Sequence, residues 1–301
     1  MPSFQRNLLT FFSITRVQNG LLVVVAQYLS AIFILGREQR VRLLLQNLEL
    51  HMIVLASFLV VSSGYLINQY YDHPKDLINR PIKTVIDGQW RLSSIMRMYL
   101  TLNFLAFLVA SSVSLRAALY FVGYITTIWL YSHRIRTLFL WGSLLSAFLA
   151  VSPIAALFLY YRHVEPMILV FAGFLFLLLW ALVQLKDLHN LRGDISAGFK
   201  TIPIVLGESK TRMILRLIFS CLSLISIALP LVFDLGLMAY YFWASLPFFV
   251  FLAIDLWINR PSLSYIKMRM LLKIWVLLGT LSILFLDFER LNQLKALIFT
   301  P

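Results

Sequence analysis

The acidic residues of this sequence are few, and several of them are grouped in two short segments. The first segment, NQYYDHPKDLINRP at residues 68–81, contains Asn68, Asp72 and Asp76 at intervals of four. On a continuous helix these side chains would share one face, where their oxygen atoms would suit a hard cation. The second segment, KDLHNLRGDISAGFKTIP at residues 186–203, contains Asp187 and Asp194. It would supply a second cluster of carboxylates.

Basic residues surround both acidic segments. Arg80 and Lys83 follow the first cluster, and Lys186, Arg192 and Lys200 surround the second. Carboxylates that bind Mg²⁺, together with Lys and Arg, commonly surround a diphosphate, because metal ions bridge carboxylate and phosphate oxygens. The pattern therefore indicates a metal-dependent diphosphate site. The alternative is that both segments are ordinary loops whose acids and bases pair with one another.

The rest of the chain predicts the elements that must hold these segments. Of its 301 residues, 60% are hydrophobic and 13% are charged, with a mean hydropathy of +0.85, whereas soluble domains have roughly 25% charged residues. Since a helix needs about 20 apolar residues to cross a bilayer, we expect an all-α, polytopic membrane protein with about nine transmembrane helices. The predicted spans are residues 18–35, 51–70, 93–112, 117–132, 139–160, 165–186, 212–232, 237–257 and 271–287.

A short internal similarity suggests one domain built from two related halves. IKTVIDG at residues 82–88 resembles FKTIPIVLG at residues 199–207, and each follows an acidic pair. We therefore expect a single domain, residues 1–301, with halves at about 1–135 and 136–257 and a last helix at 271–287. The single cysteine, Cys221, lies in a predicted span and excludes a disulfide framework or a CxxC-type site.

The net charge of +13 is distributed as membrane topology requires. With the N-terminus in the cytoplasm, 19 of the 26 Lys and Arg residues fall in cytoplasmic segments. The other seven are Arg37, Arg40, Arg42, Arg116, Arg162, Arg290 and Lys295. We therefore expect no nucleic-acid partner, and we expect both acidic segments on the cytoplasmic side.

The two segments resemble the motifs of a known family. NQYYDHPKDLINRP resembles the NDxxDxxxD motif, and KDLHNLRGD resembles the KDxxDxxGD motif, of UbiA-type intramembrane prenyltransferases. Three further segments resemble the same family in the expected order: TRVQNGLLVVVAQYL, YSHRIRTLFLWGS and GFKTIPIVLG. The resemblance thus extends over nearly the whole chain.

The resemblance implies a helix bundle around a central cavity that opens sideways to lipid. There an isoprenyl diphosphate donor is ionised and its prenyl group passes to a lipophilic acceptor. By this resemblance, one Mg²⁺ would be bound by Asn68, Asp72 and Asp76, and a second by Asp187 and Asp194. The residues expected to hold the diphosphate are Asn68, Arg80, Lys83, Arg134, Lys186 and Lys200.

The residues that end the first motif indicate which acceptor the enzyme uses. DLINRP resembles the form found in the digeranylgeranylglyceryl phosphate synthase, chlorophyll synthase and homogentisate prenyltransferase branches. We expect geranylgeranylglycerol phosphate as acceptor, with an aromatic or quinone-precursor acceptor as the alternative. A secondary transporter and a non-catalytic prenyl-lipid binder are alternatives of another class. A transporter would place charged residues near the middle of its spans, whereas here they cluster just past helix ends on one face and only Asp255 is placed otherwise.

Three residues depart from the family pattern. Gln69 stands where an acidic residue is common, and Asn190 leaves a neutral oxygen where the second motif often has Asp. Pro74 lies between two motif aspartates, lacks an amide donor and is expected to kink or break the helix.

Aromatic rings near the motifs are expected to stabilise the allylic cation by roughly 1 to 2 kcal/mol each in a dry cavity. We assign Tyr131 to the catalytic group with the four aspartates; the alternative for each ring is packing or an interfacial position. The candidate rings are Tyr65, Tyr70, Tyr71, Phe121, Tyr124 and Tyr131.

Overall fold

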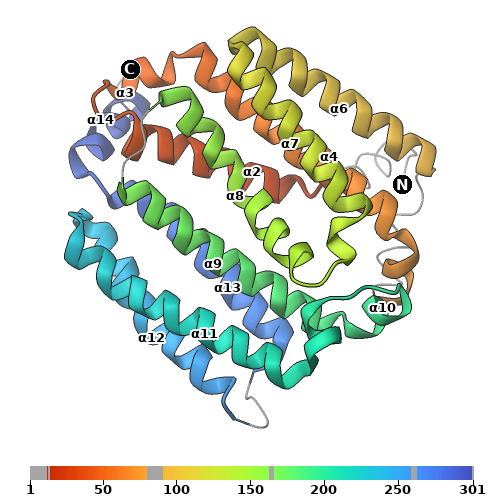
Figure 1. Ribbon diagram of the computed structural model, residues 1–301. Coiled ribbons are helices and arrows are strands. Elements are labelled where there is room, and N and C mark those ends of the chain that lie inside the picture. The colour runs from red at the N-terminus through yellow and green to blue at the C-terminus, as the bar shows by residue number, and fades with distance from the viewer. Residues whose placement is uncertain (1–11, 13, 80–90, 163–165, 259–262, 300–301) are drawn as a thin grey trace.

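The computed structural model describes residues 12, 14–79, 91–162, 166–258 and 263–299, with the backbone alone for 74–79, 298 and 299. Every regular element in this part of the chain is helical (Figure 1). Eight segments are long and apolar enough to cross a bilayer, which confirms the predicted all-α membrane fold. They are α2 (Val17–Ser30) with the π-helix η1 (Ala31–Leu35), α4 (Leu48–Asn79), α6 (Leu92–Val113), α8 (Trp141–Tyr161), α9 (Pro166–His189), α11 (Ile202–Val232), η3 (Gly236–Met238) with α12 (Ala239–Asp255), and α13 (Tyr265–Ser282) with η4 (Ile283–Phe285).

A further long helix, α7 (Leu115–His133), corresponds to the predicted span 117–132. It contains Arg116 and several tyrosine and threonine residues, and it is not among the eight apolar segments. It nevertheless packs against α4, α6 and α8 within the bundle. The predicted count of about nine differs from eight by this helix.

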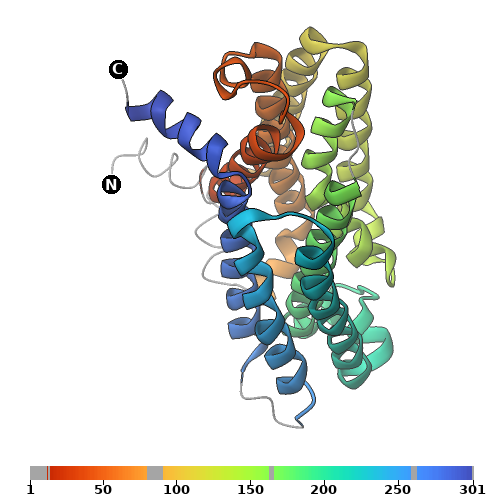
Figure 2. The same cartoon turned by 90° about the vertical axis from the view of Figure 1, so that its left-hand side faces the viewer.

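The buried apolar side chains form two clusters. One centres on α4, α6 and α7, with Phe121 fully buried. The other joins η1, α9, α11 and α12, where the rings of Phe219 and Phe249 stack. Figures 1 and 2 show the corresponding groups of helices side by side. Leu149, Ala156 and Leu157 of α8 belong to the first cluster, although the predicted division at residue 135 places α8 in the second half. The internal repeat stays a prediction.

Four short elements complete the described chain. These are α3 (Val41–Leu45), the 3₁₀ turn η2 (Ile135–Thr137), α10 (Leu191–Ser196) and α14 (Phe288–Phe299). The turn η2 packs against α7 and α8, and α10 packs against α4 and α9. Both short elements, η2 and α10, therefore lie near the ends of the helices that carry the acidic segments.

Two helices differ from the sequence-based prediction. α4 continues past Pro74 to Asn79, so the expected break is absent. A proline removes one helical hydrogen bond, which is tolerated more easily near a helix end, where a free carbonyl can reach water. α11 begins at Ile202 rather than at residue 212 and bends at Gly207, whose φ of 83° a glycine adopts without strain.

Polar side chains satisfy the backbone where Pro153 interrupts α8. Proline cannot donate to the carbonyl of Leu149, four residues earlier. The Tyr124 hydroxyl donates to that carbonyl instead, at 2.8 Å. Gln27 Nε2 donates to the Pro153 carbonyl at 2.7 Å. Because lipid provides no hydrogen bonds, these contacts tie α2 and α7 to α8.

One buried arginine anchors α14 to the end of the first helix. Arg290 is 6% exposed, and its guanidinium donates to four backbone carbonyls, of Ile32, Gly36, Arg37 and Gln39. Asp287 lies beside it, with Oδ2 3.8 Å from Nε. The side chain thereby supplies hydrogen bonds to a carbonyl of η1 and to carbonyls of the turn that follows it.

Candidate functional site

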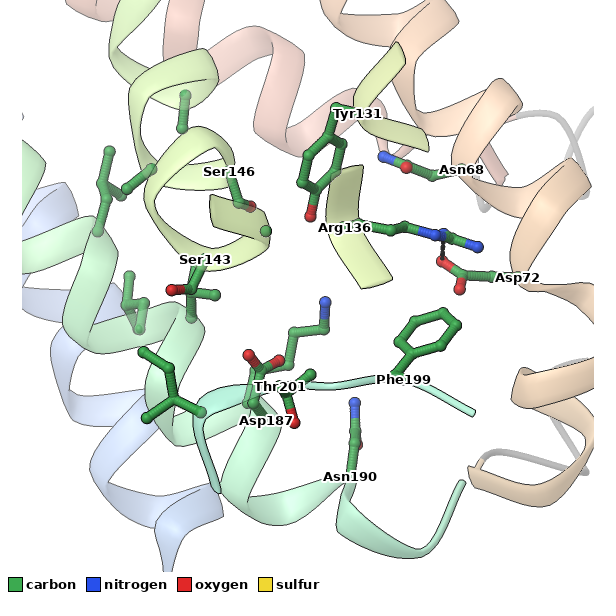
Figure 3. Close-up of a pocket in the computed structure, with 18 of the residues that line it drawn as sticks. Asn68, Asp72, Tyr131, Arg136, Ser143, Ser146, Asp187, Asn190, Phe199 and Thr201 are labelled. Carbon is green, nitrogen blue, oxygen red and sulfur yellow. Dashed lines mark ion pairs between the residues drawn. The ribbon is translucent and has the colours of Figure 1, made fainter. Parts of the chain in front are cut away.

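A cavity of about 260 Å³ lies where the two acidic segments meet (Figure 3). α4 contributes Asn68 and Asp72, α9 contributes Asp187, and Asn190 follows α9 at the N-cap of α10. The remaining walls come from η2, the start of α8, the chain after α10, the residues before α2, and α13. Residues of both motifs, far apart in sequence, therefore face one space.

Asp72 and Arg136 form an ion pair in this cavity, with Oδ2 and Nη1 2.6 Å apart. Their side chains are 21% and 9% exposed, so water screens the pair only in part. The Arg136 guanidinium also lies over the Phe199 ring, 5.3 Å from its centre. Its Nε is buried without a hydrogen-bond partner in the described part of the chain. The Nε–H group of Arg136 can therefore donate a hydrogen bond to an anion.

The connection between α7 and α8 holds Arg136 in place. Leu140 has a φ of 59°, a conformation that is strained for a residue with a side chain. Gly142 approaches the turn so closely that an added Cβ would lie 2.6 Å from the Arg136 carbonyl oxygen. The amide of Lys200 donates to the carbonyl of Thr137 at 2.9 Å, which joins the chain after α10 to η2. These contacts fix the backbone that presents Arg136.

The last turn of α9, together with Asn190 directly after it, supplies a second charged wall. Lys186, Asp187 and Asn190 line the cavity, and Asp187 and Asn190 are 7% and 5% exposed. Residues three and four apart share a helix face, which explains why this motif presents several polar groups together. Figure 3 shows Asp187 and Asn190 opposite the Asp72–Arg136 pair.

Contacts with neighbouring helices orient the α4 wall. The Ser132 hydroxyl donates to the Asn68 amide oxygen at 2.9 Å. Asn19 Nδ2 donates to the Tyr65 hydroxyl at 2.9 Å, and the Arg16 guanidinium lies 5.2 Å from the centre of the same ring. The start of α2 therefore supports Tyr65 at the cavity.

The charges of the lining favour an anion. Two carboxylates, Asp72 and Asp187, line the cavity among the described residues. The lining cations are Arg16, Arg136, Lys186, Arg269 and Lys273. Positive charge thus exceeds negative charge in a partly enclosed space, where electrostatic attraction is stronger than in water.

The residues that line the cavity also suit the binding of Mg²⁺, with the substrate supplying part of its coordination shell. Asp72 Oδ1 is buried with no hydrogen-bond partner among the described residues, which is costly for a carboxylate oxygen. Asn68, Asp187 and Asn190 place further oxygen atoms at the cavity. Within the described chain no three His, Cys, Asp or Glu side chains form a metal-binding group. Mg²⁺ is commonly held by one or two carboxylates, with phosphate oxygens and water completing its shell.

A model of the UbiA prenyltransferase family matches residues 23–286. The chain belongs to this family. As a UbiA prenyltransferase it is an enzyme that transfers prenyl groups, and it is an integral, multi-pass membrane protein. The transporter and the non-catalytic lipid binder are therefore set aside.

Relatives of this UbiA chain include named archaeal enzymes. The digeranylgeranylglyceryl phosphate synthase of Thermococcus sibiricus is 29% identical over 233 residues, which are 75% of this chain and 78% of the relative. The synthase of Thermococcus gammatolerans is 25% identical over 280 residues, 91% of this chain and 96% of the relative.

Solved structures share the UbiA fold. A digeranylgeranylglyceryl phosphate synthase structure has a TM-score of 0.68 at 18% identity and covers 96% of this chain and 99% of its own. A UbiA homologue from Archaeoglobus fulgidus bound to DMAPP and Mg²⁺ has a TM-score of 0.69 at 13% identity and covers 94% of this chain and 99% of its own.

The sequence-predicted site residues divide into two sets. Those that line the cavity are Asn68, Asp72, Tyr131, Lys186 and Asp187. Arg134 and Lys200 are exposed and Asp194 is fully buried in α10; none of these three belongs to the lining. Arg80, Lys83 and the side chain of Asp76 lie outside the described residues. The functional roles of all of them stay predictions.

Sequence reasoning missed several lining residues. Arg136 and Phe199 lie inside segments that resemble the family, so the segments were identified but not these side chains. Arg16 was counted only as part of the first-helix pattern. Arg269 and Lys273 lie on α13, distant from both motifs, and nothing in the sequence separates them from cations that set topology.

Proposed function

We propose that this prenyltransferase moves a geranylgeranyl group from geranylgeranyl diphosphate to geranylgeranylglycerol phosphate, with Mg²⁺. The observation that carries the proposal is one cavity in an apolar bundle where carboxylates of both motifs face an excess of cations. The acceptor is taken from the relatives named digeranylgeranylglyceryl phosphate synthase.

Different lining side chains bind the diphosphate of the donor and its Mg²⁺. Arg136 and Lys186 hold the diphosphate by charge-assisted hydrogen bonds, and Arg136 has an unused Nε for this purpose. Asp72 and Asp187 would hold Mg²⁺, with Asn68 as a neutral ligand. When bound, Mg²⁺ supplies Lewis acidity that neutralises the leaving diphosphate. Asp76 and Asp194 stay predicted Mg²⁺ ligands, and Arg80, Lys83, Arg134 and Lys200 stay predicted diphosphate-binding residues.

The reaction replaces one carbon–oxygen bond with another. The allylic carbon–oxygen bond of the donor breaks, and the electron pair leaves with the diphosphate. Tyr131 and Phe199 lie on either side of Arg136 (Figure 3), where their rings stabilise the allylic cation. The acceptor hydroxyl oxygen then forms the new bond and loses its proton. Leu179, Leu182 and Val183 of α9 help to exclude water, which would otherwise quench the cation.

The distribution of basic residues also predicts on which side of the membrane the reaction occurs. The charge distribution supports a cytoplasmic location for the motif ends of α4 and α9, where a water-soluble diphosphate head group is available. In a Cys221→Ser background, labelling of single cysteines introduced at Ser196 and Ser114 with a membrane-impermeant reagent tests this orientation. Cytoplasmic labelling at position 196, and not at position 114, is the expected result.

Transfer by the purified full chain tests the function. Labelled geranylgeranyl diphosphate is offered with geranylgeranylglycerol phosphate and with aromatic acceptors, with Mg²⁺ or with a chelator. We expect metal-dependent labelling of geranylgeranylglycerol phosphate that Asp72→Asn abolishes and Asp234→Asn, at an exposed loop residue, preserves. Labelling of an aromatic acceptor alone would show that the acceptor assignment is wrong. Absence of both transfer and metal-dependent diphosphate binding would contradict the site.

A further inference from the structure

A second polar cavity, the distal cavity, lies between the start of α4, the end of α6, the start of α7 and the end of α8. Its volume is about 420 Å³, within the usual range of small-molecule sites. In Figure 1, α3 lies at this end of the bundle and α10 at the other. At about 1.5 Å per residue of helix, Glu49 of its lining is roughly 35 Å from Asp72 along α4. The distal cavity and the reaction cavity therefore lie near opposite faces of the membrane.

Two arginines make the lining of the distal cavity positive. Arg116 of α7 and Arg162, directly after α8, line it together with one described acid, Glu49. Neither guanidinium forms an ion pair or a side-chain hydrogen bond with the residues that the structure describes, whereas Glu49 lies close to the Tyr160 hydroxyl. The first turn of α7 also belongs to the lining, and the amide end of a helix adds positive potential. The distal cavity therefore favours an anion.

Membrane topology does not account for this pair of arginines. In the orientation that the charge distribution supports, only seven Lys and Arg residues lie on the side opposite the cytoplasm, and Arg116 and Arg162 are two of them. Basic residues are disfavoured on that side. Two arginines in one cavity there are better explained by a ligand that they bind.

The apolar residues around these charges suit a lipid better than a soluble anion. Ile53, Phe121 and Leu159 line the distal cavity beside the arginines. Leu115 and Leu119, on the same end of α7, are exposed, as is Leu159. A lipid whose head group enters the cavity can therefore lay its hydrocarbon chains along exposed apolar side chains, and this contact is favourable.

We propose that the distal cavity binds the phosphate head group of a membrane lipid from the leaflet opposite the reaction cavity. Arg116 and Arg162 hold the phosphate, since a guanidinium can bind phosphate oxygens in bidentate fashion. The bound lipid contacts α4, α7 and α8 together and thereby stabilises the folded bundle. This site is separate from the proposed function and does not depend on which acceptor is used.

Thermal unfolding of the delipidated full chain in detergent tests the site. The probes are a short-chain phosphatidic acid, the matching diacylglycerol and inorganic phosphate. We expect only the phosphatidic acid to raise the unfolding temperature in a saturable way. In the double variant Arg116→Gln/Arg162→Gln, its apparent Kd should rise roughly 10- to 100-fold. Arg42→Gln is the matched control, because Arg42 is an exposed arginine of α3 outside the lining.

Two further variants separate the possible outcomes. Arg116→Lys/Arg162→Lys keeps both charges and should retain most of the binding, which excludes a folding defect as the cause of the loss in the Gln variant. Arg136→Gln, in the reaction cavity, should bind the phosphatidic acid as the wild type does. Loss of the shift in Arg136→Gln would place the lipid at the reaction cavity and overturn the inference. An equal Kd in the wild type and the double Gln variant, or an equal shift with inorganic phosphate, would also overturn it.

Discussion

Arg136 on the turn after α7 and Asp72 on α4 are joined by an ion pair of 2.6 Å inside the cavity. The pair occupies one carboxylate oxygen and leaves the other, Oδ1, without a hydrogen-bond partner among the described residues. Arg136 thereby orients the very side chain that the proposed reaction needs as a metal ligand. The pair links donor binding to metal binding through two neighbouring groups.

Arg136→Gln should weaken donor binding more than any change at Arg134. Loss of the guanidinium removes charge-assisted hydrogen bonds, and we expect the KM for geranylgeranyl diphosphate to rise about 10- to 100-fold. Arg134→Gln is the matched comparison, because Arg134 is exposed and does not line the cavity. Steady-state kinetics at varied donor concentration gives both values. The opposite ranking would support the sequence-based assignment of the diphosphate to Arg134.

Gly142→Ala should reduce activity without removing any functional group. The new Cβ would lie 2.6 Å from the Arg136 carbonyl oxygen, so the turn must shift and move Arg136. Misplacement of a binding group by about 1 Å can cost roughly 100-fold in rate. Gly173→Ala is the control, since no atom lies within 4 Å of its added Cβ. Equal activity of the two variants would show that the close approach at Gly142 is unimportant.

Tyr124→Phe should destabilise the bundle while leaving the site intact. The variant loses the hydrogen bond to the Leu149 carbonyl, which Pro153 leaves without a helical donor. Such interhelical bonds contribute about 0.6 to 1.7 kcal/mol in membranes. Unfolding in mixed detergents measures the difference, with the exposed Tyr240→Phe as control. A Tyr124→Phe protein as stable as the control would refute the proposed compensation.

Arg290→Gln should release α14 from the end of the first helix. Burial lowers the pKa of the Arg290 guanidinium and the Asp287 carboxylate opposes this shift, yet arginine stays charged at neutral pH. The variant leaves buried carbonyls without donors, and we expect a loss of roughly 2 to 4 kcal/mol in stability. Limited proteolysis after residue 287 should become faster. Lys295→Gln, at an exposed position of α14, should behave as wild type.

The helices were predictable because lipid imposes a strong hydropathy signal on each span. The convergence of Asp72 and Asp187 followed from two motifs at the ends of helices that face the same side. Arg136 was not predictable, because its position depends on a strained Leu140 and on close packing at Gly142, which are tertiary effects. Of the kink or break expected at Pro74, the break was wrong, because α4 continues to Asn79, and the kink stays a prediction.

The two apolar clusters have a consequence for how such an enzyme diversifies. Most of the buried side chains that form them do not line the cavity. Substitutions at lining positions outside the clusters are therefore expected to alter what the cavity binds at little cost to folding, whereas substitutions in the clusters cost stability. Substitutions in one wall of the cavity can therefore change which acceptor is bound while the helix bundle is retained.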